Sequence, residues 1–404
     1  MTGRTGAPVA GFAPPLYPFD KLGEYHDLAA RHEGGAVDLS IGTPCDPPPP
    51  AVLEALAGSG SERGYPASVG SAELREAASA WIARRFGVVV EPSAVAACIG
   101  TKELVAGVPH WLRLRTPGRD TVLYPELAYP TYEMGAMLAG CRAVPVRRER
   151  GGGLDLAAVS DEDAARSVVL WVNSPSNPAG TLEDLGAAAA WGRVHGVPVF
   201  SDECYVEFTW DGPGRSILQS GPEGVVAVHS LSKRSNLAGL RVGFFAGDPE
   251  LVAYLAALRR HAGFMVPGPV QHAAAVALSD ERHVEEQKER YRERLELFAE
   301  VLEASGLAAP MPAGSFYLWA GLAEVAETQS ASGAASPGDE SLGFAIGRAL
   351  AREGGVVVSP GEAYGPSGRP FVRIAMVQPL ERLKLVAGRL AGKVLEAAGV
   401  GFDS

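Results

Sequence analysis

Short hydrophobic runs alternate with stretches of helical spacing through the middle of the chain. The runs are the length of short strands, and helical candidates at residues 102–114 and 182–195 lie between them. Such alternation of buried strands and helices is typical of a doubly wound α/β sheet, in which ligands bind at the carboxyl ends of the strands. The predicted strands are residues 95–99, 121–124, 142–146, 168–172, 197–200, 225–229 and 242–246.

The pattern changes after Pro267. A long, charged helical stretch reaches about residue 303, short strands are predicted at residues 315–320, 356–359 and 371–376, and a last helix extends to about residue 398. This order predicts a separate, smaller α+β domain. The stretch Glu324–Glu340 has few large apolar residues and many Ser, Ala and Gly, so we predict a surface loop there.

The N-terminal part shows a third pattern. The first 20 residues are rich in Pro and Gly, which favours an extended arm that lies on another surface, such as that of a second subunit. An apolar run follows at residues 37–41, and a helix is predicted to start at Val52. Ser71 can cap a further helix, one face of which is formed by Leu74, Ala77, Ala78, Trp81 and Ile82.

Composition and charge limit the functions that the chain can have. Its 404 residues are 47% hydrophobic, enough for a large core in two or more domains. Asp and Glu outnumber Lys and Arg by 47 to 36, a net charge of −11, which argues against a general binder of nucleic acids or membrane surfaces. No run of residues suits a membrane span or a secretory signal, so we expect a cytoplasmic protein. Dispersed cysteines without histidines at ligand spacing predict reduced thiols and no metal site.

The segment 225–243 carries the strongest chemical signal. A predicted strand leads into Lys233, which has Ser230 and Ser232 just before it and Arg241 after it. A lone lysine is usually a solvated surface residue, but this one follows apolar residues and stands where the ligands of such sheets bind. An amine beside phosphate-binding groups suits a Schiff base with pyridoxal phosphate. The pattern S-x-S-K-x(7)-R resembles that of the fold-type I, class I and II aminotransferases.

The resemblance implies a fold and a cofactor. It predicts a large domain with a mixed, mostly parallel sheet between helices, and a smaller α+β domain. We place the arm and part of the small domain at residues 1–45, the large cofactor-binding domain at 46–274 and the rest of the small domain at 275–404. The resemblance also implies pyridoxal 5′-phosphate held covalently by a catalytic lysine, Lys233, with the phosphate surrounded by Ser230, Ser232 and Arg241.

Three upstream residues correspond to the family's contacts with the cofactor ring. Asp202 ends a predicted strand; an Asp there is often only a helix cap, but the resemblance implies a partner for the pyridine nitrogen. Tyr205 and Asn177 correspond to the two hydrogen-bond donors to the phenolic oxygen, and Asn177 is also a predicted substrate contact. Residues 173–180 resemble the family's N-x-P-x-N-P-x-G loop, although Asn, Pro and Gly would also suit an ordinary turn.

Further family positions complete the predicted cofactor site. Thr101 and Lys102 open a predicted helix, where free backbone N–H groups and the helix dipole can hold phosphate. Tyr129 resembles the aromatic residue that stacks on the pyridine ring; a buried packing tyrosine is the alternative. Tyr65 corresponds to a tyrosine that reaches the cofactor phosphate of the neighbouring subunit. The resemblance therefore implies a homodimer in which each subunit completes the other's site.

Arg373 is the main predicted contact with the substrate. It lies inside an otherwise apolar strand, and burying its charge would be costly without a partner. The neighbouring sequence offers no obvious acidic partner, so a bidentate grip on the substrate α-carboxylate is favoured over a structural ion pair. Gly42 corresponds to the family position whose backbone N–H also meets that carboxylate.

The resemblance also implies the reaction. Lys233 would move a proton between substrate and cofactor, and an amino group would pass from an amino acid to a 2-oxo acid with ping-pong kinetics. Stretches such as residues 38–44 and 260–267 resemble the actinobacterial succinyldiaminopimelate aminotransferases, which transfer an amino group from glutamate to N-succinyl-2-amino-6-oxopimelate in lysine biosynthesis. Lys102 and Arg260 are candidates for the distal carboxylates of these substrates. Another pair of amino acid and 2-oxo acid, or a lyase of the same fold, is an alternative.

Overall fold

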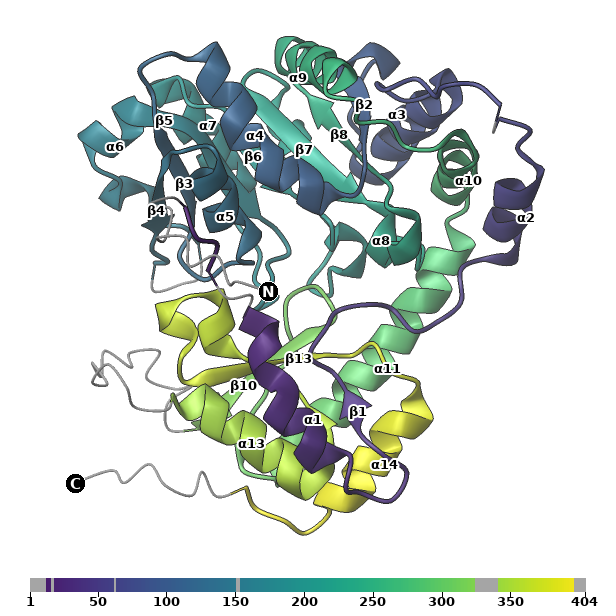
Figure 1. Cartoon of the computed structure of the whole chain (residues 1–404), viewed down its shortest axis with the longest axis vertical. Coiled ribbons are helices and arrows are strands. Elements are labelled where there is room, and N and C mark those ends of the chain that lie inside the picture. The colour runs from purple at the N-terminus through teal and green to yellow at the C-terminus, as the bar shows by residue number, and fades with distance from the viewer. Residues whose placement is uncertain (1–11, 16–17, 62, 150–152, 324–340, 396–404) are drawn as a thin grey trace, which may run out of the picture.

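The computed structural model describes residues 12–15, 18–61, 63–149, 153–323 and 341–395 (Figure 1). Its largest element is a seven-stranded sheet in the order β2-β8-β7-β6-β5-β3-β4. β8 is antiparallel to both of its neighbours, and the other pairs are parallel. This confirms the predicted mixed, mostly parallel sheet. Its strands are β2 (Val95–Cys98), β3 (Thr121–Pro125), β4 (Arg142–Val146), β5 (Ser167–Asn173), β6 (Val199–Asp202), β7 (Val225–Ser230) and β8 (Gly243–Gly247).

Helices cover both faces of this sheet, so its central strands are apolar on both sides. Successive residues of β5 show the alternation: Leu170 and Val172 join one core, whereas Val169 and Trp171 join the other. The first core is closed by α2 (Pro50–Gly58), α3 (Ala72–Phe86), α7 (Leu185–His195) and α10 (Gly268–Ser279). The second is closed by α4 (Thr101–Arg115), α5 (Thr131–Leu138) and α9 (Pro249–His261).

A smaller α+β unit lies below the large sheet in Figure 1. Its four-stranded antiparallel sheet has the order β12-β13-β10-β9, and β1 pairs with β11 in a separate parallel ribbon. The strands are β1 (Val37–Asp38), β9 (Leu307–Ala308), β10 (Tyr317–Leu322), β11 (Val356–Val357), β12 (Ser359–Pro360) and β13 (Phe371–Ala375). Its helices are α1 (Gly23–Ala29), α11 (Arg282–Ala304), α13 (Leu342–Gly354) and α14 (Leu380–Leu390).

Several element boundaries differ from the sequence predictions. The charged stretch after Pro267 forms two helices, α10 and α11, rather than one. The predicted last helix ends at Leu390 instead of about residue 398, close to Gly392, which has a φ of +73°. Residues 18–22 form a short 3₁₀ helix where we predicted an extended arm, and the strand predicted at 356–359 is divided between β11 and β12.

Other predictions fall outside what the structure tests. The loop predicted at residues 324–340 and most of the N-terminal arm lie outside the described residues. The predicted domain limits stay a prediction, and the limit at residues 274 and 275 falls within α10. Among the residues that the structure describes, no helix is long and apolar enough to cross a membrane.

Candidate active site

Most of the functional residues predicted from the sequence meet in one cavity of about 320 Å³ at the carboxyl ends of the parallel strands. β5, β6 and β7 supply residues at or just after their ends, α4 supplies its first turn, and β13 of the smaller unit supplies Arg373. The predicted residues that line this cavity are Gly42, Thr101, Lys102, Tyr129, Asn177, Asp202, Tyr205, Ser230, Ser232, Lys233, Arg241 and Arg373.

Lys233 lies on the one-turn helix α8 (Leu231–Arg234), which follows β7 directly. The hydroxyl of Ser230 caps this turn by accepting a hydrogen bond from the backbone N–H of Ser232 (3.2 Å). The Lys233 amine donates to the carbonyl oxygen of Gly42. Burial, assisted by the nearby charges of Arg373 and Arg241, lowers the pKa of this amine to about 8. Roughly a tenth of the amine is therefore neutral, and nucleophilic, at pH 7.

Asp202 ends β6, and both of its carboxylate oxygens have donors. Oδ2 accepts from the hydroxyl of Tyr132 (2.8 Å), and Oδ1 accepts from the backbone N–H of Cys204 (3.2 Å). Burial raises the pKa of Asp202, while these hydrogen bonds and the charge of Lys233 oppose the rise. The carboxylate is thus fixed at the wall of the cavity, where it can pair with a cationic ring nitrogen.

Arg373 reaches the cavity from β13 and is almost fully buried. One guanidinium nitrogen donates to Oδ1 of Asn177 (3.0 Å), and another donates to the carbonyl oxygen of Ser40. The guanidinium carbon lies 4.3 Å from the ring centre of Tyr317 and 4.9 Å from that of Tyr364. These acceptors and rings carry no charge, and the guanidinium lines the cavity, where it can bind an anionic ligand.

Tyr205 and Asn177 are held on the remaining sides of the cavity. The hydroxyl of Tyr205 shares a 2.9 Å hydrogen bond with the hydroxyl of Tyr317. The backbone N–H of Asn177 donates to Oδ1 of Asn173 (2.7 Å), which fixes the loop after β5. Both side chains are buried. The two predicted donors to one ligand oxygen therefore stand in the same pocket.

The part of the cavity at the start of α4 is suited to an anion. Thr101 is the first residue of α4, where the backbone N–H groups are free to bind a ligand. Arg241, which has a φ of +55°, lies against Gly100, the residue before Thr101. Gly100 has a φ of +71°, and a Cβ there would overlap the Arg241 guanidinium. Glycine therefore allows Arg241 to approach the helix start, and the hydroxyls of Ser230 and Ser232 line the same cavity.

Two predicted residues lie outside this cavity. Tyr65, in the loop between α2 and α3, has 98% of its surface exposed in the single chain. Arg260, near the end of α9, is also exposed and is not among the residues that line the cavity. By contrast, Lys102 lies at the cavity edge, where its amine contacts the Tyr129 hydroxyl at 3.2 Å.

Two tyrosines that hold the site together, Tyr132 and Tyr317, are not among the residues predicted from the sequence. Tyr132 follows Tyr129 by three residues, so its position at the start of a helix could have suggested a place near the strand ends. Tyr317 has no such signal, because it approaches Tyr205 and Arg373 only through the pairing of β10 with β13. Its place depends on the fold rather than on any local motif.

The chain is similar in sequence and in fold to known aminotransferases. The family described as "Aminotransferase class I and II" matches residues 35–390. A probable aminotransferase of Mycobacterium tuberculosis is 41% identical over 93% of this chain and 85% of that protein. The 4-dedimethylamino-4-oxo-anhydrotetracycline transaminase OxyQ of Streptomyces rimosus is 40% identical over 93% of this chain and 99% of that protein. A solved structure of a probable N-succinyldiaminopimelate aminotransferase from Thermus thermophilus has a TM-score of 0.79 at 34% identity and covers 92% of this chain and 98% of its own.

Proposed function

The chain belongs to the class I and II aminotransferases, and from this premise we propose that Lys233, Asp202 and Arg373 form the centre of its active site. The family membership makes the protein a transaminase that uses pyridoxal 5′-phosphate and acts on small amino acids and oxo acids. The observation that supports the proposed site is the convergence of an amine, a carboxylate and a guanidinium in one cavity of about 320 Å³.

The residues present fit this cofactor. The start of α4, the serine hydroxyls and Arg241 form a cradle for a phosphate, and Gly100 is needed for the cradle to close. Asp202 would hold the protonated pyridine nitrogen, Tyr129 would cover the ring face, and Asn177 and Tyr205 would donate to the phenolic oxygen. When bound, pyridoxal 5′-phosphate supplies an aldehyde that condenses with amines and a ring that accepts electrons from the substrate's α-carbon.

Lys233 is proposed to move the proton in this reaction. Its amine is in part neutral near pH 7, because burial lowers its pKa to about 8. It can therefore accept the proton from the α-carbon of a bound amino acid and return it to the other side of the reacting system. The hydrogen bond from Tyr132 keeps Asp202 in place during this transfer. In the proposed site, Lys233 thus moves one proton, whereas Asp202 and Arg373 hold charges.

Arg373 is proposed to bind the α-carboxylate of the substrate. The guanidinium is rigidly placed by Asn177, Ser40 and two tyrosine rings, and a carboxylate can accept two parallel hydrogen bonds from it. Gly42 lies on the same side, with its carbonyl next to Lys233. A substrate held in this way would present its α-carbon to the Lys233 amine.

We further propose that the amino acceptor is N-succinyl-2-amino-6-oxopimelate and the donor is glutamate. The similarity to the Thermus thermophilus structure supports this substrate. An open groove of about 1260 Å³ adjoins the cavity, and the cationic side chains on it are those of Lys102, Arg147, Arg241 and Arg369. A long substrate with a distal carboxylate could extend along this groove. The groove also carries glutamates, which offset part of this positive charge. Among them, Glu103 pairs with Arg259, and Glu362 lies 3.7 Å from Arg369.

A second candidate acceptor is a bulky cyclic ketone. The similarity to OxyQ supports it, since that relative is named for such a substrate. The same groove also carries apolar side chains, among them Met134, Met137 and Pro145. A bulky, weakly charged substituent would therefore find both space and contact surface there.

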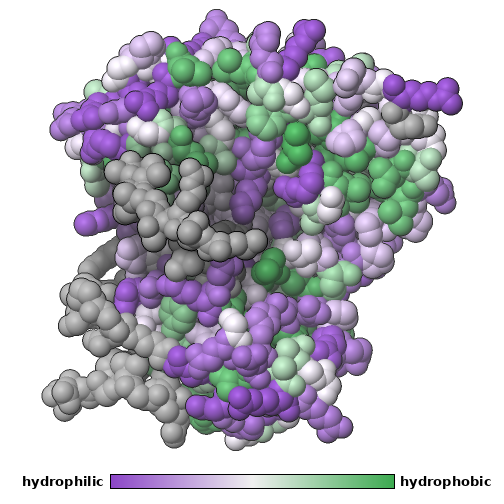
Figure 2. All heavy atoms as spheres, in the orientation of Figure 1, coloured by the Kyte–Doolittle hydropathy of each residue, from purple (hydrophilic) through white to green (hydrophobic). Residues whose placement is uncertain are grey.

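The protein is also proposed to act as a homodimer in which Tyr65 serves the partner's site. In the single chain this large side chain is 98% exposed, and Leu53 on α2 is 46% exposed. Figure 2 shows hydrophobic residues gathered on the same side of the molecule, over α2 and α10. Covering this surface with a second copy of the chain would remove apolar area from water.

The test is a substrate panel. Purified enzyme loaded with pyridoxal 5′-phosphate is incubated with glutamate and one acceptor at a time, and 2-oxoglutarate is measured. We expect the highest kcat/KM with N-succinyl-2-amino-6-oxopimelate. Higher kcat/KM with the anhydrotetracycline ketone would favour the second candidate, and turnover restricted to short 2-oxo acids would contradict both.

A further inference from the structure

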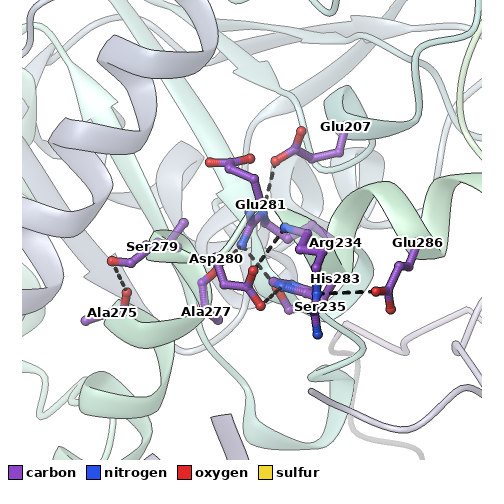
Figure 3. Close-up of polar contacts among 12 residues, drawn as sticks. Glu207, Arg234, Ser235, Ala275, Ala277, Ser279, Asp280, Glu281, His283 and Glu286 are labelled. Atoms are coloured by element: carbon purple, nitrogen blue, oxygen red, sulfur yellow. Dashed lines mark hydrogen bonds and ion pairs between the residues drawn. The ribbon is translucent and has the colours of Figure 1, made fainter. Parts of the chain in front are cut away.

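A buried polar network holds the residue that follows Lys233 (Figure 3), and its members Arg234, Ser235 and His283 do not line the cavity. Its centre is Arg234, the next residue in the chain, whose side chain is only 4% exposed. Arg234 Nε donates to Oε1 of Glu207 (3.1 Å), and Nη1 donates to the carbonyl oxygen of Ala277 (2.8 Å). A buried guanidinium is costly unless it is paired in this way.

Glu207 links Arg234 to a second part of the active site. It lies in the 3₁₀ turn Val206–Phe208, directly after Tyr205. Its carboxylate also accepts from Trp81 Nε1 (3.0 Å) and pairs with Arg85 Nε (2.9 Å). Although burial works against it, Arg234 and Arg85 hold the pKa of Glu207 below its usual value. The charged pair thus joins the segment that bears Lys233 to the segment that bears Tyr205.

A second branch of the network runs from Arg234 through Ser235 to His283 and Asp280. Arg234 Nη1 donates to the Ser235 hydroxyl oxygen (3.1 Å), so the hydroxyl proton is available to His283 Nε2 (2.9 Å). The other ring nitrogen of His283 can then donate to Asp280 Oδ2 (3.0 Å). Burial and the charge of Arg234 lower the pKa of His283, which agrees with a neutral ring.

This Ser-His-Asp order resembles a hydrolase triad, but its setting differs. Ser235 is completely buried, and its hydroxyl already accepts from Arg234. A nucleophilic serine has to be open to its substrate. The branch therefore connects parts of the structure instead of attacking a substrate.

The parts it connects are α8 and the junction between α10 and α11. The carbonyl of Ala277 belongs to the last turn of α10, where a cation is favoured by the helix dipole. Asp280 Oδ1 accepts from the backbone N–H of Arg282 (2.9 Å), at the first residue of α11. From that point α11 runs into the smaller unit (Figure 1). The network thus ties the lysine turn to the place where the chain leaves the large sheet.

We propose that Arg234, Ser235 and His283 are positioning residues for Lys233. They hold α8 so that the Lys233 amine stays at the Gly42 carbonyl, within reach of the reacting atoms. The inference rests on the proposed role of Lys233. Stability alone does not require these charges, because apolar residues can often replace a buried ion pair without loss. The function that we assign to these buried charges is to place the neighbouring lysine, which an apolar residue could not do.

The test compares holoenzyme variants with a matched control. Arg234→Gln removes the charge, Arg234→Lys keeps it, and Ser235→Ala breaks the link from Arg234 to His283 but leaves the pair of Arg234 with Glu207. Arg282→Gln is the control, since its side chain is 88% exposed and pairs only loosely with Glu286. For each variant, kcat, KM for glutamate, melting temperature and the pH midpoint of the bound-cofactor absorbance are measured.

For Arg234→Gln we expect kcat to fall by about 10²-fold, the cost of displacing a reacting group by roughly 1 Å, with KM little changed. The absorbance midpoint should move by about half a pH unit or more, because the lysine's surroundings change. Ser235→Ala should shift kcat and the midpoint in the same direction but less, Arg234→Lys should restore part of the loss, and Arg282→Gln should match the wild type.

The outcomes separate this inference from the proposed function. Lys233→Ala is assayed alongside and should lose the absorbance of covalently bound cofactor. If it does, but Arg234→Gln and Ser235→Ala change only the melting temperature, the positioning role is overturned and the proposed site stands. If Lys233→Ala keeps that absorbance, the proposed site itself is wrong, and the positioning role falls with it.

Discussion

Burial gives Lys233 a different acidity from that of a surface lysine. Its pKa is lowered to about 8 from an ordinary value of 10.5, with burial as the main cause. Only the neutral amine can attack an aldehyde, and the neutral fraction grows as pH rises through the pKa. The chemistry of Lys233 therefore depends on its buried position in the cavity. The local sequence indicates this position only in part.

This predicts the pH dependence of cofactor uptake. When apoenzyme is mixed with pyridoxal 5′-phosphate, the rate of covalent binding should rise with pH and level off above about 8. The rate is followed by stopped-flow absorbance at constant ionic strength. A rate that keeps rising towards pH 10.5 would show that the reacting lysine is not shielded from water.

Gly42 illustrates a residue whose importance lies in what it lacks. Its carbonyl accepts from the Lys233 amine, and a Cβ at this position would overlap the Tyr317 hydroxyl. We predict that Gly42→Ala lowers kcat/KM by about 10- to 100-fold, because either Tyr317 or the Gly42 carbonyl has to move. Steady-state kinetics test this. Gly388→Ala in α14, where a Cβ meets open space, is the control and should keep wild-type activity.

At the scale of elements, periodicity located all seven strands of the large sheet but did not set every boundary. The break between α10 and α11 has no proline or glycine. Asp280 accepts from the Arg282 N–H as a local cap, but Ser235, which contacts His283 at the break, is distant in the sequence. Local propensity therefore gives only part of the signal, because a tertiary contact also shapes the break. Ser71, by contrast, was predicted as a helix cap, since that contact is local: its hydroxyl accepts from the Leu74 N–H (3.1 Å).

The cap gives a prediction at the same scale. Ser71→Ala should lower the free energy of unfolding by about 1 kcal/mol, since one N–H at the start of α3 loses its acceptor. Ser71→Asp, which can still cap, should recover most of the loss. Urea denaturation of the three proteins measures the difference. Equal stability of the alanine and wild-type proteins would mean that water replaces the hydroxyl fully.

At the scale of the whole molecule, the candidate site was predictable where its residues stand in short sequence motifs. Lys233 with Arg241, and Asn177 in its loop, stand in motifs that the sequence displays directly. Other contacts come from elsewhere in the chain: Tyr132 holds Asp202, Tyr317 holds Tyr205, and Ser40 holds Arg373. The register of β10 with β13 decides where Tyr317 lies. Such contacts follow from tertiary folding, so a single sequence does not contain a local signal for them.

Tyr65 raises the remaining question at this scale, since it is exposed in one chain. If it completes the partner's site, mixing inactive Tyr65→Ala and Lys233→Ala proteins should create one intact site in each mixed dimer. After subunit exchange, a 1:1 mixture should regain about a quarter of wild-type activity, because half of the dimers are mixed. A mixture that stays inactive although size analysis shows exchange would place Tyr65 outside the partner's site.

The central claim, that Lys233 is the amine which holds the cofactor, can be tested directly by borohydride trapping. The loaded enzyme is reduced, digested and mapped by mass spectrometry. We predict a single pyridoxyl-phosphate adduct, on the peptide that contains Lys233. An adduct on Lys102, the other lysine that lines the cavity, with Lys233 unmodified, would contradict the account.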